Sequence, residues 1–382
     1  MFWQREILRS AIAMTFNQTW EYDLPKNGLL GSLVLYVRST QNGYPFLTAV
    51  KWRLIDYISK IEVIGDGSTI IKSYDGRQAL ASAFYDEGGV EPPSMWRHYS
   101  NTPHRQWIPI NFGRRLFDDL LALDLSRYNQ VTLKVTNNAT ATEFTTNVQI
   151  DVVAYWMRES AGQLAGHLRE EEWKTWAPVA AAVEYNDLPI GLPIRRILLR
   201  GRPGVDTADA KNNSSMHRLM SDIDFTFRTG QTRVYKGSLE DLGHLSVLEL
   251  GRFAETRGAI DRTQSYGFET GVGYVMQNAG VWTTDADGIA TVLGNMRADV
   301  QDSAQEMGYR TANGMLAWLV RGHGYMHNVP LFAARSPDLG DLLDPDALKD
   351  VKVDITCQSG TTVSGTAAAA ENAIILSRLV RA

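Results

Sequence analysis

The stretch DLPKNGL at residues 23–29, which leads into LVLYVR at residues 33–38, recurs as DLPIGL at residues 187–192, which leads into ILLR at residues 197–200. The first residues of the two copies, Asp23 and Asp187, set the sequence offset at 164. Each copy joins a turn rich in Pro and Gly to an apolar run that is suited to a β-strand. Because a missed internal repeat mis-assigns the whole fold, this recurrence is the first guide to the architecture.

A second match follows at residues 59–67 and 221–230, where Ser59 and Ser221 give an offset of 162. Each copy then shows a β-rich run and a helix start. The helix starts are Asp75 with Gln78 and Ser238 with Asp241, an oxygen acceptor followed three residues later by a polar partner.

A third match closes each copy, residues 108–136 in the first and 329–356 in the second. Here the offset rises to 221, measured between Pro109 and Pro330. The second copy therefore holds an insertion of about 58 positions between its helix and its closing strands. Three matches in one order predict an internal duplication.

Local patterns in both copies favour strands. Residues 61–71, 131–136 and 148–154 are rich in β-branched side chains, alternate with a period of two, and are interrupted or bounded by turns such as Gly65-Asp66-Gly67 and Asn137-Asn138. A copy of roughly 150 residues suits an eight-stranded jelly roll better than an immunoglobulin sandwich of about 100. We therefore predict an all-β chain, two tandem eight-stranded jelly rolls (a double jelly roll) with short helical excursions. The rolls are predicted at residues 15–158 and 177–382, with an insertion at about 252–328.

Two segments are predicted to lie outside the rolls, an N-terminal arm at residues 1–14 and a linker at 159–176. At helical spacing, Trp3, Ile7 and Leu8 share one face with Ile12, so residues 1–13 predict a short amphipathic helix. Such a helix docks on its own domain, or it contacts a membrane surface or a neighbouring subunit. The connector at 158–176 is charged and helix-prone, with glutamates at residues 170–172, and indicates a linker of fixed shape.

Composition narrows the range of partners. The net charge is -5 and 21% of residues are charged, so the chain has no global basic field for a nucleic-acid backbone. The single cysteine, Cys357, excludes an intrachain disulfide, and a buried apolar role is expected for it. The segment 1–13 does not resemble a secretory signal, and no later stretch approaches the roughly 20 apolar residues of a spanning helix.

The motifs that could carry chemistry are incomplete. His323 and His327 have i,i+4 spacing, but the flanking glycines oppose a helix and no glutamate follows, so exposed loop histidines are expected. Residues 285–288 open like a calcium loop, yet Met296 stands where the bidentate glutamate belongs. We therefore predict no catalytic, cofactor-binding or metal-binding residues. Several aromatic residues in predicted loops instead suggest interfaces or loops pinned to their own domain: Trp96, Tyr99, Trp107, Trp282 and Tyr325.

The duplicated β unit resembles the double jelly-roll major capsid proteins of tailless icosahedral double-stranded DNA viruses, which include membrane-containing phages, archaeal turreted viruses and, more distantly, adenoviruses. The residues that carry the resemblance are 23–38, 61–67, 107–113 and 123–128. The resemblance implies a structural, non-enzymatic protein of the virion, made in the host cytoplasm. It further implies a homotrimer that forms a pseudo-hexagonal capsomer beside neighbouring capsomers, with penton and minor capsid proteins as further partners.

Three expectations remain open at this point. Residues 1–13 are expected to face the particle interior and contact an internal membrane or an adjacent capsomer. The insertion is expected to project outward as a tower with a small core of its own. The competing functions are a tandem jelly-roll hydrolase acting on carbohydrates or amides, which would show a clustered acid pair, and a sugar-binding module, which would show aromatics along a groove.

Overall fold

The computed structural model describes residues 1–42, 53–95, 97–98, 101–159, 164–202, 216, 219–261, 271–284, 290–292, 315–334, 339–357 and 370–382. The chain divides into two units. Unit 1 contains residues 1–45, 53–172 and 377–382, and unit 2 contains residues 46–52 and 173–376. The boundaries at 172/173 and 376/377 fall inside two strands, β12 (Gly166–Trp176) and β23 (Glu371–Arg381).

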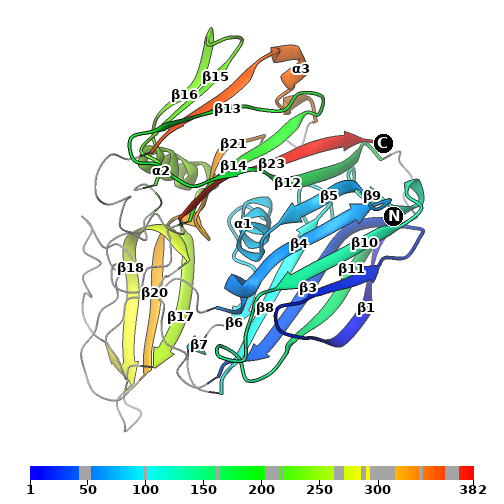
Figure 1. Ribbon diagram of the computed structural model, residues 1–382, viewed down its shortest axis with the longest axis vertical. Coiled ribbons are helices and arrows are strands. Elements are labelled where there is room, and N and C mark those ends of the chain that lie inside the picture. The colour runs from blue at the N-terminus through cyan, green and yellow to red at the C-terminus, as the bar shows by residue number, and fades with distance from the viewer. Residues whose placement is uncertain are drawn as a thin grey trace. The chain divides into compact units, whose positions relative to one another are not determined.

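Unit 1 contains two antiparallel sheets of four main strands each (Figure 1). The first sheet has the order β1-β11-β3-β8, formed by Phe2–Met14, Val148–Arg158, Leu29–Thr40 and Pro103–Asn111. The second has the order β2-β10-β4-β5, formed by Thr19–Asp23, Val131–Asn137, Ile58–Gly65 and Thr69–Tyr74. Short elements complete the unit: β6 (Ser94–Met95), β7 (Arg97–His98), β9 (Leu123–Asp124), η1 (Leu54–Tyr57) and η2 (Leu125–Arg127).

Alternation explains why these residues form a sandwich. β10 alternates buried and half-buried side chains along its whole length, so Val131, Leu133 and Val135 point inward. In the other sheet, Leu33, Leu35 and further residues of β3 are also fully buried. Burying one such side chain stabilises the fold by about 1.5–3 kcal/mol, and that gain holds the two sheets face to face.

Unit 2 repeats this strand order. One set of neighbours is β23-β14-β21, where β14 is Ile194–Arg202 and β21 is Asn328–Ala333. The other is β13-β22-β15-β16, formed by Val183–Asp187, Val351–Thr356, Asp222–Phe227 and Thr232–Ser238. The short helices are η4 (Leu339–Asp341) and α3 (Pro345–Leu348). Strand by strand, β11-β3-β8 of unit 1 correspond to β23-β14-β21 of unit 2. Likewise, β2-β10-β4-β5 correspond to β13-β22-β15-β16. This order, with its crossovers between two sheets, is that of a jelly roll.

Both predicted helix starts are confirmed. α1 (Gly76–Asp86) begins after Asp75, whose carboxylate accepts from the Gln78 backbone N–H while the Gln78 side chain bonds back to Asp75. α2 (Leu239–Leu250) begins after Ser238, whose hydroxyl accepts from the backbone N–H of Asp241. These caps satisfy donors that a helix start otherwise leaves without partners.

The helix predicted for residues 1–13 is wrong. These residues form β1, which pairs with β11 from Phe2↔Arg158 to Met14↔Val148 and carries β-bulges between Ile7 and Ile12. The helix-prone connector at 158–176 likewise contains a strand, β12. In both places pairing with a distant strand overrides local helix propensity.

β1 and β12 are counterparts in the repeat. Their first residues, Phe2 and Gly166, are related by the offset of 164, and the dipeptide Arg5-Glu6 recurs with the same offset as Arg169-Glu170. Each strand therefore stands in the first position of its roll. We propose that the rolls begin at β1 and β12 rather than at residues 15 and 177.

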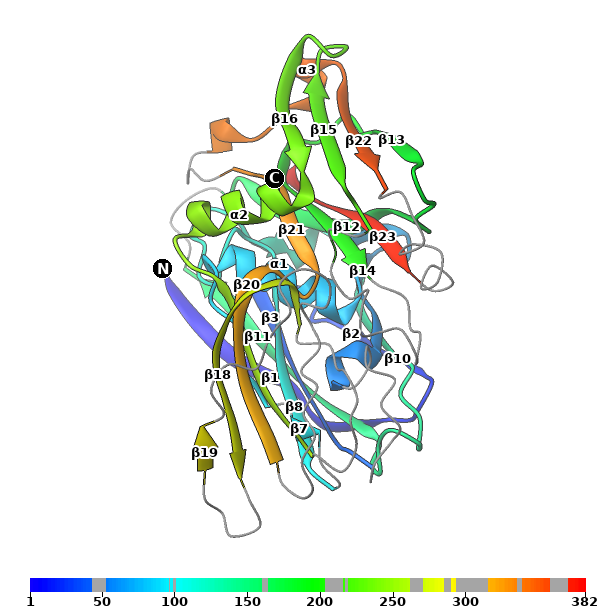
Figure 2. The same ribbon diagram turned by 90° about the vertical axis from the view of Figure 1, so that its left-hand side faces the viewer.

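The described part of the predicted insertion contains strands of 3 to 13 residues. β17 (Ala254–Asp261), β18 (Val272–Thr284), β19 (Ala290–Val292) and β20 (Met315–Tyr325) form an antiparallel sheet of order β19-β18-β20-β17. Figure 1 shows β18, β20 and β17, and Figure 2 shows β19 beside β18. The side chains expected to form its core lie outside the described residues or side chains: Tyr266, Phe268, Tyr274, Val275, Trp282, Leu293 and Trp318. The projecting tower stays a prediction.

Candidate functional site

The two histidines that the sequence placed in an exposed loop are buried in the structure. His323, on β20, and His327, in the turn before β21, are 1% and 0% exposed, so they are not exposed loop residues. Cys357 is buried directly after β22, and burial raises the pKa of its thiol, which opposes a thiolate nucleophile. Among the described residues, no group of three or more His, Cys, Asp or Glu side chains could hold a metal ion. The calcium-like residues 285–288 lie outside the described residues.

Several aromatics predicted in loops are in strands. Trp107 lies on β8 and stacks on Tyr36 of β3 with ring centroids 4.4 Å apart. Tyr325 ends β20 and is buried, and Trp282 lies within β18. Trp96 and Tyr99 lie outside the described residues.

The three consecutive glutamates of β12, expected in a linker of fixed shape, bind different partners in unit 1. Glu170 lies 3.5 Å from Lys72 of β5 and accepts from the hydroxyl of Ser82 on α1 at 2.8 Å. Glu171 binds Arg378 of β23 and also lies 2.6 Å from Arg169. Glu172 accepts from the side-chain amide of Gln78 on α1. The triplet therefore ties β5, α1 and β23 to one strand.

His167 lies beside this network and is 3% exposed. Burial, reinforced by the positive charges of Lys72 and Arg127, lowers the pKa of His167 to about 4 from an ordinary 6.5.

This shift predicts a loss of stability on acidification. Between pH 6.5 and 4 the unfolded chain binds a proton at residue 167 that the folded chain does not, so the free energy of unfolding falls as the pH falls. The contribution of His167 to this slope approaches about 1.4 kcal/mol per pH unit. Urea unfolding of the wild type and of H167Q at pH 4.5, 5.5 and 6.5 measures it. We expect a shallower slope for H167Q, and equal slopes would contradict the assignment.

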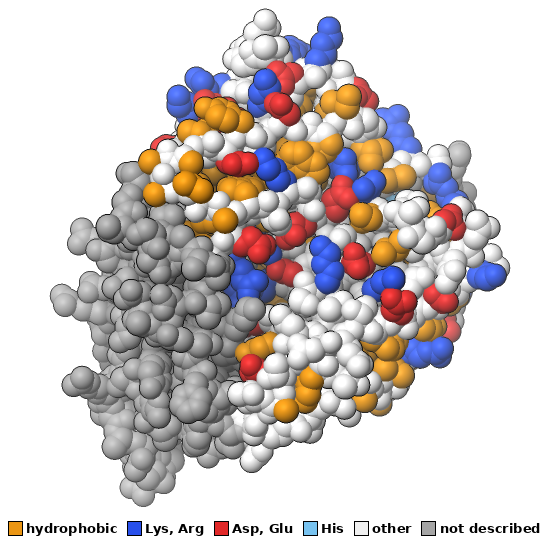
Figure 3. Space-filling model, viewed as in Figure 1, with side chains coloured by type: hydrophobic (Ala, Val, Ile, Leu, Met, Phe, Trp, Pro, Cys, Tyr) orange, Lys and Arg blue, Asp and Glu red, His pale blue; other side chains and the backbone are white. Residues whose placement is uncertain are grey.

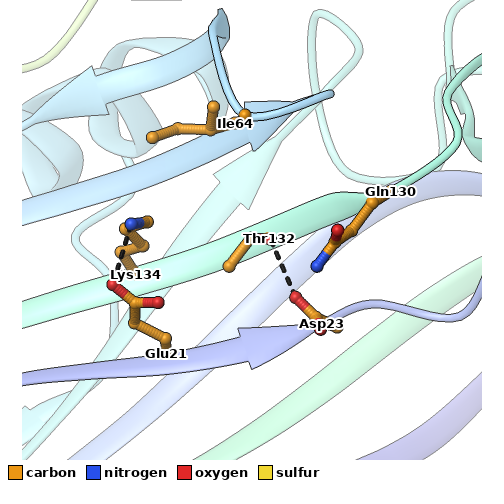
Figure 4. Close-up of a pocket in the computed structure, with 7 residues that line it drawn as sticks. Glu21, Asp23, Ile64, Gln130, Thr132 and Lys134 are labelled. Atoms are coloured by element: carbon orange, nitrogen blue, oxygen red, sulfur yellow. Dashed lines mark hydrogen bonds and ion pairs between the residues drawn. The ribbon is translucent and has the colours of Figure 1, made fainter.

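A polar hollow of about 310 Å³ lies on the second sheet of unit 1 (Figure 4). Its wall comes from β2, β10 and the β4–β5 turn. In this wall Glu21 lies 2.8 Å from the ammonium of Lys134, and Asp23 accepts from the hydroxyl of Thr132 at 2.8 Å. Hydrogen bonds from Gln130 and Thr132 lower the pKa of Asp23.

This electrostatic setting does not suit hydrolysis. A glycosidase needs one carboxyl whose pKa is raised so that it can donate a proton to the leaving group. Asp23 has the opposite shift, and Glu21 is held in an ion pair. Asp354 and its cross-strand neighbour Asp224 resemble the acid pair of a hydrolase more closely. Burial and the Asp224 charge raise the pKa of Asp354. Asp224, however, is bound by both nitrogens of the Arg233 fork at 2.9 and 3.0 Å.

The exposed surface carries apolar residues at strand edges and on one helix. Ile7 of β1 is 65% exposed, Tyr185 of β13 is 72% exposed, and Leu248 of α2 is 77% exposed. Acidic and basic side chains are interspersed with apolar ones over the described part of the face in Figure 3. These features suit contacts with other proteins better than a site for a small molecule.

Solved structures share this strand arrangement over the whole chain. The major capsid protein P2 of bacteriophage PM2 aligns over 99% of this chain and 98% of its own, with 8% identity and a TM-score of 0.51. The fold is a double jelly roll. This chain also aligns with the VP54 protein of PBCV-1, in a structure fitted into a reconstruction of the virophage Sputnik. The alignment covers 99% of this chain and 94% of VP54, with 10% identity and a TM-score of 0.51.

A chain from the atomic structure of Sulfolobus Turreted Icosahedral Virus aligns over 93% of this double jelly roll and 90% of its own length, with 11% identity and a TM-score of 0.51. No protein-family model matches the sequence, and no curated protein matches it. The similarity therefore lies in the fold, and the predicted fold class is confirmed.

Proposed function

We propose that this chain is the major capsid protein of an icosahedral virus. The observation that carries the proposal is the alignment of the whole double jelly roll with the PM2 major capsid protein, which leaves almost no part of either chain unmatched. A protein that acts by tiling needs two similar units and a surface suited to protein contacts, and this chain has a repeated strand order and exposed apolar side chains.

The proposed role is structural and not enzymatic, with the virion as the location. The charged residues described above in unit 1 support this role, because they bind one another in its interior or form ion pairs on its surface. The electrostatics of the Glu21–Asp23 hollow do not favour the alternative hydrolase function.

The proposed partners are other capsid components. We infer a homotrimer that packs against neighbouring capsomers, penton proteins and minor capsid proteins, without sequence-specific binding of nucleic acid. The structure has no helix long and apolar enough to span a membrane among its described residues. Residues 1–13 were expected to contact an internal membrane or an adjacent capsomer, and the strand found there removes the amphipathic helix on which the membrane contact was based.

The proposal is tested with purified full-length protein and with particles. We expect light scattering to give three times the mass of the chain, and negative-stain images to show hexagonal plates or shells. Immunogold labelling of the producing virus should mark the shell surface. A stable monomer at micromolar concentration, together with unlabelled particles, would contradict the proposal.

A further inference from the structure

In unit 1, the first strand of the second repeat, β12, contacts a strand of the first repeat. There β12 pairs in parallel with β5, through Glu170↔Lys72 and Glu171↔Ser73. This contact gives β5 a neighbour on the side away from β4. Four of the six residues of β5 and the first nine residues of α1 are buried.

The counterparts of these two strands have no such neighbour among the described residues. β16 stands in the second repeat where β5 stands in the first, and β1 stands in the first repeat where β12 stands in the second. β16 is the last strand of β13-β22-β15-β16, and β1 is the first strand of β1-β11-β3-β8. Each therefore leaves one row of backbone N–H and C=O groups open to pairing.

The exposure of equivalent side chains also differs between the two repeats. Val234 of β16 is 45% exposed, and Leu245 and Leu248 of α2 are 42% and 77% exposed. In the first repeat the positions that correspond to Val234 and Leu245 are Ile71 and Ser82, with 0% and 5% exposure. In the same way Ile7 of β1 is 65% exposed, whereas its counterpart in β12, Glu171, is 8% exposed. Equivalent elements are covered where the strand contact forms and bare where it does not.

We propose that β1 of a second copy of this chain pairs in parallel along β16 and covers the exposed apolar residues of β16 and α2. The repeat itself identifies the occupant, because β1 is the segment that matches β12. The inference rests on the proposed function in that it names the surfaces through which capsid subunits meet.

The offsets give the register of this contact. Glu171 corresponds to Ile7 with an offset of 164, and Ser73 corresponds to Lys236 with the offset of 163 that also relates Asp75 to Ser238. Since Glu171 and Ser73 are partners in the chain, Ile7 of one copy lies opposite Lys236 of the next. The two surfaces differ, so the contact is head-to-tail, and such contacts close into a ring when the rotation between copies allows.

Disulfide cross-linking tests this register. The full-length double variant Ile7→Cys with Lys236→Cys, in a Cys357→Ser background, is oxidised at low protein concentration and run on a non-reducing gel. We expect covalent multimers that end at three chains, and mass spectrometry should find a disulfide-linked peptide pair that joins positions 7 and 236. The matched control is Ile7→Cys with Ile190→Cys, because Ile190 is also 65% exposed but follows β13, at the other edge of the β16 sheet. We expect at least about tenfold less multimer from it.

The outcomes separate this inference from the proposed function. Cross-linking no greater than in the control, or a disulfide between positions 7 and 236 of one and the same chain, overturns the β1–β16 contact. If light scattering still shows a trimer in that case, the capsid proposal stands and only the contact is wrong. If the reduced variants and the wild type are monomers, no cross-link forms and the particles stay unlabelled, both are wrong.

An independent variant addresses the apolar part of the contact. Leu248→Asp places a charge where we propose that a second copy covers the helix, and the residue is 77% exposed in one chain, so the fold of the chain should tolerate it. We expect the trimer to dissociate at a protein concentration at least about tenfold higher than for the wild type, since burying a charge without a partner costs more than one factor of ten. Leu120→Asp, at a site 41% exposed in unit 1, is the control and should leave dissociation unchanged.

Discussion

Replacement of Glu170 by alanine is expected to lower the free energy of unfolding by about 3–5 kcal/mol. The carboxylate and the Lys72 ammonium that faces it have side chains only 3% and 2% exposed. Without Glu170, the Lys72 charge stays buried and loses this anionic partner at 3.5 Å, and the Ser82 hydroxyl loses its acceptor. Urea unfolding at pH 7 measures the change.

Two further variants isolate the cause. The double variant Lys72→Met with Glu170→Leu removes both charges and keeps the volume, so it should be more stable than Glu170→Ala. Glu21→Ala removes an ion pair of shorter distance, 2.8 Å, but with side chains 55% and 31% exposed. It should cause no measurable change, because water screens exposed pairs. Equal losses for Glu170→Ala and Glu21→Ala would show that burial of the charge is not the cause.

The second large effect is expected at the start of β12. Gly166 has a φ of +139°, and a Cβ built on it would lie 1.9 Å from the carbonyl oxygen of Val380 on β23. Neither atom belongs to a flexible side chain, so Gly166→Ala must move one strand away from the other. We expect a loss of about 3 kcal/mol or more, from backbone strain and overpacking together.

Gly67→Ala is the matched control. Gly67 also has a positive φ, +75°, but a Cβ there would meet no atom within 4 Å. Its loss should reflect backbone strain alone, about 1–2 kcal/mol. Hydrogen exchange of β23 adds a local measurement, since only Gly166→Ala should accelerate exchange there. If the two variants lose the same stability and β23 stays protected, the close approach to Val380 does not constrain the strand.

Local sequence was sufficient for much of the fold. The strands β4, β5, β10 and β11 follow from two-residue alternation and from β-branched side chains, and both helices follow from their capping residues. The order of the three repeat matches predicted two similar rolls, the second with an insertion. The proposed β1–β16 contact could be predicted from the sequence only in part. Ile7 belonged to a predicted helix, and Lys236 is a single charge in a β-rich run, which is compatible with any exposed strand.

The sequence by itself determined the duplication, because similar segments can be compared wherever they lie in the chain. It also determined the strand-rich character and the two helix starts, because these depend on residues close together in the chain. Only the tertiary structure decided that residues 2–14 and 166–176 are strands and that Glu170, His323 and His327 are buried. Apolar residues at positions 3, 7, 8 and 12 are compatible with a helix, and three adjacent glutamates are compatible with a solvated linker. The partners that override these local preferences lie far away: β11 pairs with β1 from about 140 residues along the chain, and Lys72 faces Glu170 across 98 residues. Pairing and burial at such separations are properties of the packed chain, so local pattern does not record them.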